Sequence, residues 1–163
     1  MIEPNLMNEY REVYDFCHKF FECYYTRRDP ELVVPMVSPN AICLGLSPNE
    51  VAPNREVFEK FLRHQVETVP APIRYTISHY VQTPTAPGHW VVLAKLKMLI
   101  SADSGAKMRY DVRLTAAIRK DEKRWWFDLI HTSEIVRRDP DSLILFEKNE
   151  SEIHRELGEV IIQ

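Results

Sequence analysis

The sequence has few cysteines, no long hydrophobic run and no large excess of charge of either sign. Cys17, Cys23 and Cys43 are an odd number and lack metal-ligand spacing, which argues against a disulfide framework and a cysteine-based metal site. The apolar segment at 91–100 contains two lysines and is much shorter than the roughly 20 residues of a membrane-spanning helix. The N-terminus lacks the basic start and apolar stretch of a secretory signal. We therefore expect a cytoplasmic protein that makes no membrane contact.

Charge and motifs exclude further classes of protein. A formal net charge of −3 gives no general attraction for nucleic acid, and basic residues form only short pairs, at 27–28 and 137–138. The sequence contains no phosphate-binding loop, dinucleotide-binding fingerprint, nucleophile elbow or HExxH motif. We therefore expect no nucleic-acid partner, no cofactor and no bound metal.

The length of 163 residues is typical of one domain. We place that domain at residues 1–136 and a tail at 137–163. Within the tail, Ile153, Leu157 and Val160 have the spacing of one more amphipathic helix.

The first half of the sequence has helical periodicity. Aromatic and apolar residues recur at helical spacing and predict a long helix that ends near Arg28: Tyr10, Tyr14, Cys17, Phe21 and Tyr24. Asp29 and Pro30 have the N-cap and first-turn chemistry of a second, short helix. Residues 41–46 suit a buried strand, the spacing of Ser47 and Glu50 is that of a helix capping box, and a third helix is expected over 54–68.

The second half alternates with the period of strands. Strands are predicted at 73–82, 89–101, 107–119 and 124–136, separated by short segments rich in turn-forming or charged residues. Short connections between successive strands predict an antiparallel meander. The fold class is therefore α+β, with the N-terminal helices packed on one face of a curved antiparallel sheet.

Several short motifs follow one another in the last two strands. An R-x-T segment at 113–115 is followed by a charged turn at 121–123, an aromatic residue at Trp125 or Trp126, and an H-x-S ending at 131–133. In this order they resemble the SnoaL-like branch of the nuclear transport factor 2-like superfamily, over residues 5–136. The resemblance implies a cone-shaped fold in which the sheet wraps around the first helix and leaves a cavity at its open end. It also implies a choice of roles, since members include isomerases, dehydratases and polyketide cyclases as well as ligand sensors and assembly domains.

Strand alternation predicts which residues line that cavity. One face of the last strand combines apolar and polar groups: Trp125, Phe127, Leu129, His131 and Ser133. A similar face of the strand at 73–82 carries Tyr75 and His79. An apolar wall with a few polar groups is typical of a ligand pocket. We therefore expect these side chains and Tyr14 to line one cavity, with Trp126 and Asp128 pointing away from it.

Two histidines on these faces have alternative interpretations. An imidazole can donate or accept a proton at neutral pH, so His131 is the candidate catalytic group for enolisation or dehydration of a carbonyl compound. The alternative, for both His131 and His79, is a buried histidine hydrogen-bonded to a backbone carbonyl.

The inward face of the strand at 107–119 is also open. Its wholly apolar face should point inward by simple patterning. The R-x-T resemblance instead places Arg113 in the cavity, where it would bind a carboxylate. The apolar face with Leu96, Met98, Val112 and Leu114 would then form a homodimer interface. A solvated polar face with cross-strand ion pairs is the alternative.

These patterns favour a domain that binds a small apolar or partly anionic organic ligand, in a non-catalytic or sensory role. One alternative is a cofactor-independent lyase or isomerase, with His131 as acid and base and with Arg113 and Tyr75 stabilising an oxyanion. The other is a dimeric protein-interaction module.

Overall fold

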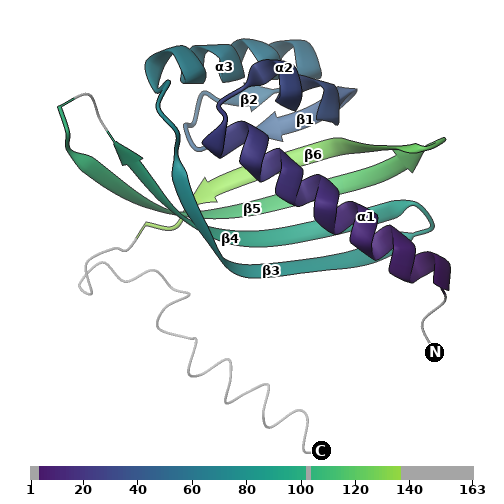
Figure 1. The fold of residues 1–163 in the computed structure, drawn as a ribbon. Helices are drawn as coiled ribbons and strands as arrows, with labels where there is room; N and C mark the ends of the chain where they lie inside the picture. The colour runs from purple at the N-terminus through teal and green to yellow at the C-terminus, as the bar shows by residue number, and fades with distance from the viewer. Residues whose placement is uncertain (1–3, 102–103, 137–163) are drawn as a thin grey trace, which may run out of the picture.

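The computed structural model describes residues 4–101 and 104–136, so the predicted tail helix lies outside the described residues. The chain begins with α1 (Pro4–Phe21), which crosses the sheet diagonally in Figure 1. Its buried side includes Val13, Cys17 and Phe20. Tyr10 and Tyr14, which the expected stripe included, are instead 43% and 41% exposed. The long helix is therefore confirmed, but its buried face is rotated away from these two tyrosines.

A π-helix, η1 (Glu22–Thr26), continues α1 and leads into a short helical segment. That segment consists of α2 (Pro30–Val33) and the 3₁₀ turn η2 (Val34–Met36). As the sequence predicts, the Asp29 side chain caps α2 by accepting a hydrogen bond from the Glu31 backbone N–H at 3.0 Å.

Two strands and a helix follow. The strand β1 (Val37–Leu44) starts and ends earlier than the expected 41–46, and the short β2 (Val51–Ala52) pairs with its end. Between them, Glu50 N–H donates to the Ser47 carbonyl at 3.0 Å in a turn, so the predicted capping box does not begin a helix. The helix α3 (Arg55–Thr68) begins after Asn54, whose side chain accepts from the Val57 N–H at 3.0 Å.

The four predicted strands are confirmed as β3 (Arg74–Ala86), β4 (His89–Ser101), β5 (Lys107–Asp121) and β6 (Arg124–Glu134). Neighbouring strands in this series are antiparallel. The sheet order is β2-β1-β6-β5-β4-β3, with β1 parallel to β6. In Figure 1 the curved sheet holds α1 on one face, while α2 and α3 lie beside β1 and β2. The α+β prediction is therefore correct.

Two bulges change which residues face the helices. In β6, Phe127 pairs with Ile118 and Leu129 with the adjacent Ala117, so Asp128 is an extra residue between them. In β3, the register shifts in the same way between Ile77 and His79. Because each bulge adds one residue, alternation beyond it is reversed.

The apolar faces of β4 and β5 point inward. Leu96, Val112 and Leu114 are at most 2% exposed and Met98 is 5% exposed, all within one copy of the chain. The predicted homodimer interface on this face is therefore wrong, because these side chains point inward and are buried within a single subunit. Whether two copies pair through another surface stays a prediction.

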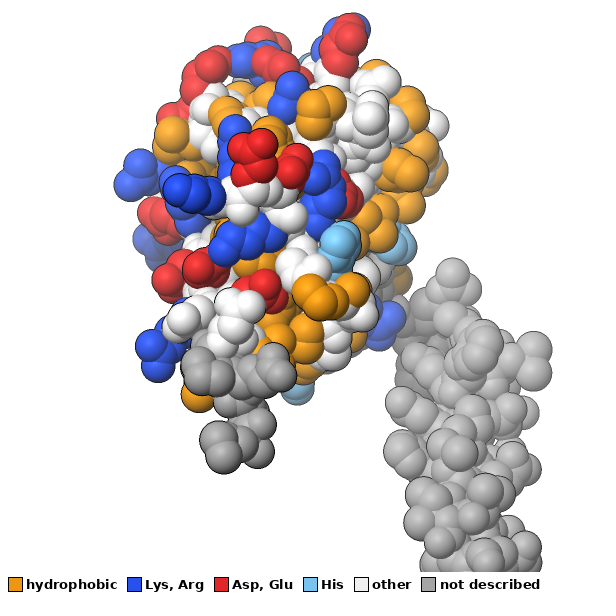
Figure 2. All heavy atoms as spheres, turned by 90° about the vertical axis from the view of Figure 1, so that its right-hand side faces the viewer, with side chains coloured by type: hydrophobic (Ala, Val, Ile, Leu, Met, Phe, Trp, Pro, Cys, Tyr) orange, Lys and Arg blue, Asp and Glu red, His pale blue; other side chains and the backbone are white. Residues whose placement is uncertain are grey.

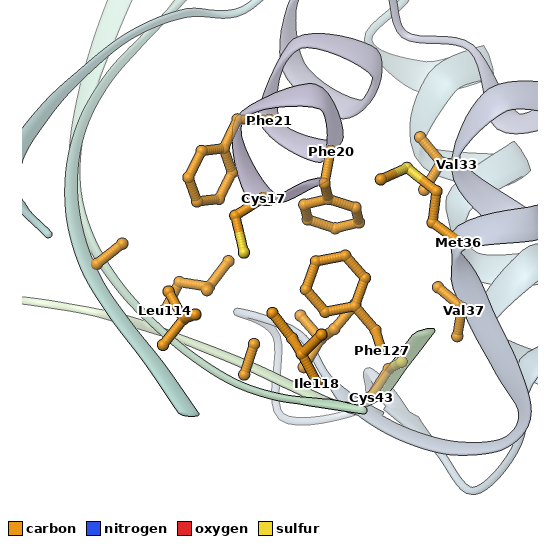
Figure 3. Close-up of a cluster of buried hydrophobic side chains, with 14 of the residues drawn as sticks. Cys17, Phe20, Phe21, Val33, Met36, Val37, Cys43, Leu114, Ile118 and Phe127 are labelled. Carbon is orange, nitrogen blue, oxygen red and sulfur yellow. The ribbon is translucent and has the colours of Figure 1, made fainter. Parts of the chain in front are cut away.

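Aromatic contacts join α1 to the sheet at the centre of this core. Figure 3 shows the rings of Phe20 and Phe127 next to each other, and their centroids are 4.6 Å apart with the ring planes tilted by 54°. Both side chains are 1% exposed, and aromatic pairs at this separation stabilise a core beyond the area they bury. No helix in the described part of the chain is long and apolar enough to cross a membrane.

Candidate functional site

A cavity of about 370 Å³ lies between η1, α3, the end of β1 and the inner faces of β4 to β6. We call it the α3 pocket. Its wall is mostly apolar and includes Phe20, Phe58, Phe61, Leu62, Met98 and Leu114. Its polar groups include Tyr24, Arg28, Glu50, Gln65 and Thr132. Such a wall, with a small number of placed polar groups, is the usual construction of a small-molecule site.

Three polar side chains of the α3 pocket form a chain of hydrogen bonds. The Tyr24 hydroxyl donates to Gln65 Oε1 at 2.6 Å, and Gln65 Nε2 donates to Glu50 Oε1 at 3.2 Å. Burial raises the pKa of the Tyr24 hydroxyl to about 12, although the nearby Arg28 cation lowers it. Tyr24 therefore stays a neutral donor at physiological pH.

Arg28 is a buried cation at the pocket wall, 6% exposed. Its Nε donates to the Val69 carbonyl at 3.1 Å, and its two terminal nitrogens donate to the carbonyls of Tyr24 and Gln65, each at 3.2 Å. These bonds join the π-helix to the C-terminal end of α3. Burial lowers the pKa of the guanidinium, but an arginine remains charged at any physiological pH.

The backbone is irregular where η1 reaches the pocket. A π-helical turn is rare and often occurs at functional sites, and this one carries Tyr24 and Tyr25 to the pocket wall. Arg28 follows with a positive φ of 53°, a conformation that is uncommon for a residue with a side chain. Its three carbonyl contacts offset this strain.

Glu50 is held close to the backbone of Gly45. An added Cβ at Gly45 would lie 2.0 Å from Glu50 Oε2, so only glycine leaves room for the carboxylate in this position. Glu50 Oε2 also accepts from the Ser47 N–H at 3.4 Å. The turn at residues 45–50 therefore places one carboxylate on the pocket wall.

None of the nine predicted site residues lines the α3 pocket. The side chains of Trp125 and Phe127 do point inward but are buried in the core, at 7% and 1% exposure. The Trp125 indole N–H donates to Glu12 Oε2 at 2.7 Å. Tyr75 is half-buried and packs on Tyr25, with ring centroids 5.6 Å apart.

The other predicted residues lie away from the cavity. Tyr14 is on the exposed side of α1, where its ring stacks on His18 at 3.8 Å between centroids. Five of the predicted residues have side chains on the outer face of the sheet: His79, Arg113, Leu129, His131 and Ser133. The predicted shared cavity of His131, Trp125 and Tyr75 is therefore wrong. Both histidines are exposed, so their interpretation as buried core residues is wrong as well.

The bulge at Asp128 explains most of this difference. Beyond it, Ile130 and Thr132 take the inward positions and line the pocket, while Leu129 and His131 point outward. A signal was present in the sequence, because the inward apolar residues Trp125, Phe127 and Ile130 break the period of two. For Tyr24, Arg28, Glu50 and Gln65 we find no comparable signal, since they come from three separate segments: η1 with the residues that follow it, the turn at 45–50, and α3.

Charges outside the pocket form no single-sign patch in the view of Figure 2, where acidic and basic side chains are mixed. Within the described residues, no cluster of histidine, cysteine and carboxylate groups could hold a metal ion. The α3 pocket is therefore the feature of the described chain that a small ligand fits best.

The family model of the SnoaL-like domain matches residues 13–137. This chain belongs to the SnoaL-like domain family. The resemblance seen in the last two strands is thereby confirmed. No curated protein sequence matches the chain.

Several solved structures share this fold, and some of them are named as NTF2-like proteins. A candidate scytalone dehydratase from Novosphingobium aromaticivorans is similar with a TM-score of 0.72 and 11% identity, over 83% of this chain and 89% of that one. A candidate dehydratase of the NTF2-like family from Streptomyces avermitilis has a TM-score of 0.70 and 15% identity, over 80% and 98%. A ketosteroid isomerase-like protein from Erwinia carotovora has a TM-score of 0.65 and 16% identity, over 77% and 95%. At such identities the likeness shows the shared fold alone.

Proposed function

We propose that this SnoaL-like domain binds a small organic molecule in the α3 pocket. The observation that carries the proposal is the pocket's construction, an apolar cavity of about 370 Å³ with a few oriented polar groups. This volume is near the lower end of the range for ligand sites, roughly 300 to 1,000 Å³. The irregular backbone at η1 and Arg28 supports the same conclusion, because strained backbone persists where surrounding contacts hold it and is concentrated at functional sites.

A binding or sensory role is favoured over catalysis by the state of the polar groups. The Tyr24 hydroxyl and the Glu50 carboxylate both already contact Gln65. The predicted acid and base, His131, lies on the outer face of the sheet with Arg113. These observations favour a site that holds a ligand by shape and hydrogen bonding, without a reaction at the ligand.

A matched pair of threonine variants tests the proposal. Thr132 lines the pocket, whereas Thr115 on the neighbouring strand pairs with His131 and faces away from it. With 4-phenylbutan-1-ol as a neutral probe, NMR titration should show binding to the wild type and to Thr115→Phe but not to Thr132→Phe. Binding that survives in a folded Thr132→Phe variant, or no binding to the wild type, would refute the proposal.

The second candidate is a cofactor-independent lyase or isomerase, and the position of Glu50 favours it. A carboxylate beside an apolar wall could accept a proton, and the neutral Tyr24 hydroxyl could stabilise an oxyanion once it exchanged its hydrogen bond to Gln65 for one to the substrate. Structures of the same fold are named as dehydratase and isomerase-like proteins. The test is α-proton exchange of 2-tetralone in D₂O, followed by NMR. Enzyme-dependent exchange that Glu50→Gln abolishes would favour catalysis, and exchange at the buffer rate would exclude it for this ketone.

A further inference from the structure

Glu50 is a carboxylate at the wall of the α3 pocket, and within residues 4–101 and 104–136 it has no cationic partner. Its two contacts come from neutral donors, the Gln65 amide at 3.2 Å and the Ser47 N–H at 3.4 Å. Both bonds are at or beyond the long end of the usual range, so the carboxylate keeps the capacity to accept a strong hydrogen bond.

The other charge of the pocket is already compensated. Arg28 donates to three backbone carbonyls, two of which, at Gln65 and Val69, belong to the C-terminal end of α3. The C-terminal end of a helix carries partial negative charge that stabilises a cation. The uncompensated charge on the pocket wall is therefore negative.

We propose that Glu50 makes the α3 pocket select an apolar ligand that ends in a protonated amine; this rests on the proposed binding function. An ammonium group would form a charge-assisted hydrogen bond with Glu50, which is stronger than a neutral one. A hydroxyl group would donate without the charge, and a carboxylate would be repelled. The apolar body of the ligand would lie against Phe58, Phe61 and Leu62.

This ligand class differs from the partly anionic molecule that the sequence suggested. That expectation depended on Arg113, which the structure places on the exposed outer face of the sheet. The pocket wall instead carries the negative charge of the Glu50 carboxylate, which the turn at residues 45–50 places there.

Three probes with the same phenylbutyl body test the proposal: 4-phenylbutylamine, 4-phenylbutan-1-ol and 4-phenylbutanoate. Their dissociation constants for the full chain are measured by NMR titration at neutral pH. We expect the amine to bind most tightly and the carboxylate most weakly. In Glu50→Gln the amine should bind about tenfold to a hundredfold more weakly, while the alcohol changes little. Glu67→Gln, on the exposed side of α3, removes the same charge outside the pocket and should leave all three constants unchanged.

The outcomes separate this proposal from the binding function. If the alcohol or the carboxylate binds the wild type as tightly as the amine, the amine selectivity is refuted while the pocket remains a binding site. If Glu50→Gln keeps the preference for the amine, Glu50 is not the source of that preference. The proposal is then refuted, while the pocket again remains a binding site. If no probe shifts the resonances of Leu62 and Leu114, both proposals fail. The comparison of probes on the wild type needs no variant, so it decides the question even if Glu50→Gln does not fold.

Discussion

The bulge at Asp128 decides which residues of β6 face the pocket, and its side chain is held by two contacts. Its carboxylate accepts from the Ser38 hydroxyl at 2.8 Å and pairs with Arg119 Nε at 2.8 Å. A hydrogen bond to a charged group contributes about 1.5 to 3 kcal/mol, and a partly exposed ion pair about 0 to 1 kcal/mol. Asp128→Ala should therefore lower the free energy of unfolding by about 2 to 4 kcal/mol.

The control for this prediction is the other carboxylate beside Arg119. Asp121 lies 3.5 Å from Arg119 Nη1, but its side chain is 62% exposed and no buried hydroxyl of the described residues bonds to it. Asp121→Ala should cost no more than about 0.5 kcal/mol. Urea unfolding followed by tryptophan fluorescence measures both variants, and Trp125 close to the bulge reports on β6.

A double-mutant cycle identifies which contact of Asp128 matters. Ser38 is 2% exposed, so its hydroxyl loses its partner without access to bulk water when Asp128 becomes alanine. In a Ser38→Ala background, Asp128→Ala should cost only about 1 kcal/mol, since the remaining contact is the ion pair. An equal cost in both backgrounds, or a cost no larger than that of Asp121→Ala, would refute the reasoning.

Three further predictions concern the α3 pocket. Gly45→Ala should weaken binding of 4-phenylbutylamine in NMR titration, because the new Cβ would lie 2.0 Å from Glu50 Oε2 and must displace it; unchanged affinity would contradict this. Arg28→Lys should lower the free energy of unfolding by about 2 to 4 kcal/mol, because an ammonium group cannot reproduce the three guanidinium bonds. The control is the exposed neighbour Arg27, because Arg27→Lys should change the free energy of unfolding by less than about 0.5 kcal/mol. Burial raises the pKa of the Tyr24 hydroxyl from 10 to about 12, so the folded state favours the neutral hydroxyl more than the unfolded state does. This contribution to the free energy of unfolding is complete below pH 10 and is lost as the pH rises from 10 to 12. In urea unfolding between pH 9 and 11, the free energy of unfolding should therefore fall less steeply with pH for Tyr24→Phe than for the wild type. The two slopes should differ by up to about 1.4 kcal/mol per pH unit.

The elements of this fold were predictable because their periodicity is strong and local. β4 was predicted at its observed bounds, and β5 and β6 at their observed first residues. For β5, simple patterning was one of two alternatives left open, and it gave the correct inward face. The weak R-x-T resemblance pointed the other way, and it misplaced both Arg113 and the homodimer interface. A continuous apolar face on two adjacent strands was the stronger physical signal, since burial of that face drives folding.

The site was less predictable because it depends on breaks in that periodicity. The bulges in β3 and β6 each reverse the alternation just before a histidine, so His79 and His131 were both assigned to the wrong face. A register argument from strand alternation holds only up to the first bulge. The spacing of apolar residues in β6 contained a sign of that bulge, whereas nothing local to the turn at 45–50 or to α3 indicated that Glu50 and Gln65 would meet.

Irregular backbone and polar chemistry coincide at the α3 pocket. The π-helix carries Tyr24 into the pocket, Arg28 closes that turn at positive φ, and the β6 bulge brings Thr132 to the opposite wall. A regular helix and a regular strand would each have continued the apolar packing of the core instead. Departures from local regularity cost stability and persist where the surrounding contacts support them, as the three carbonyl bonds of Arg28 do. Because both walls of the cavity depend on such a departure, variants that restore regular backbone should lose the pocket before they lose the fold.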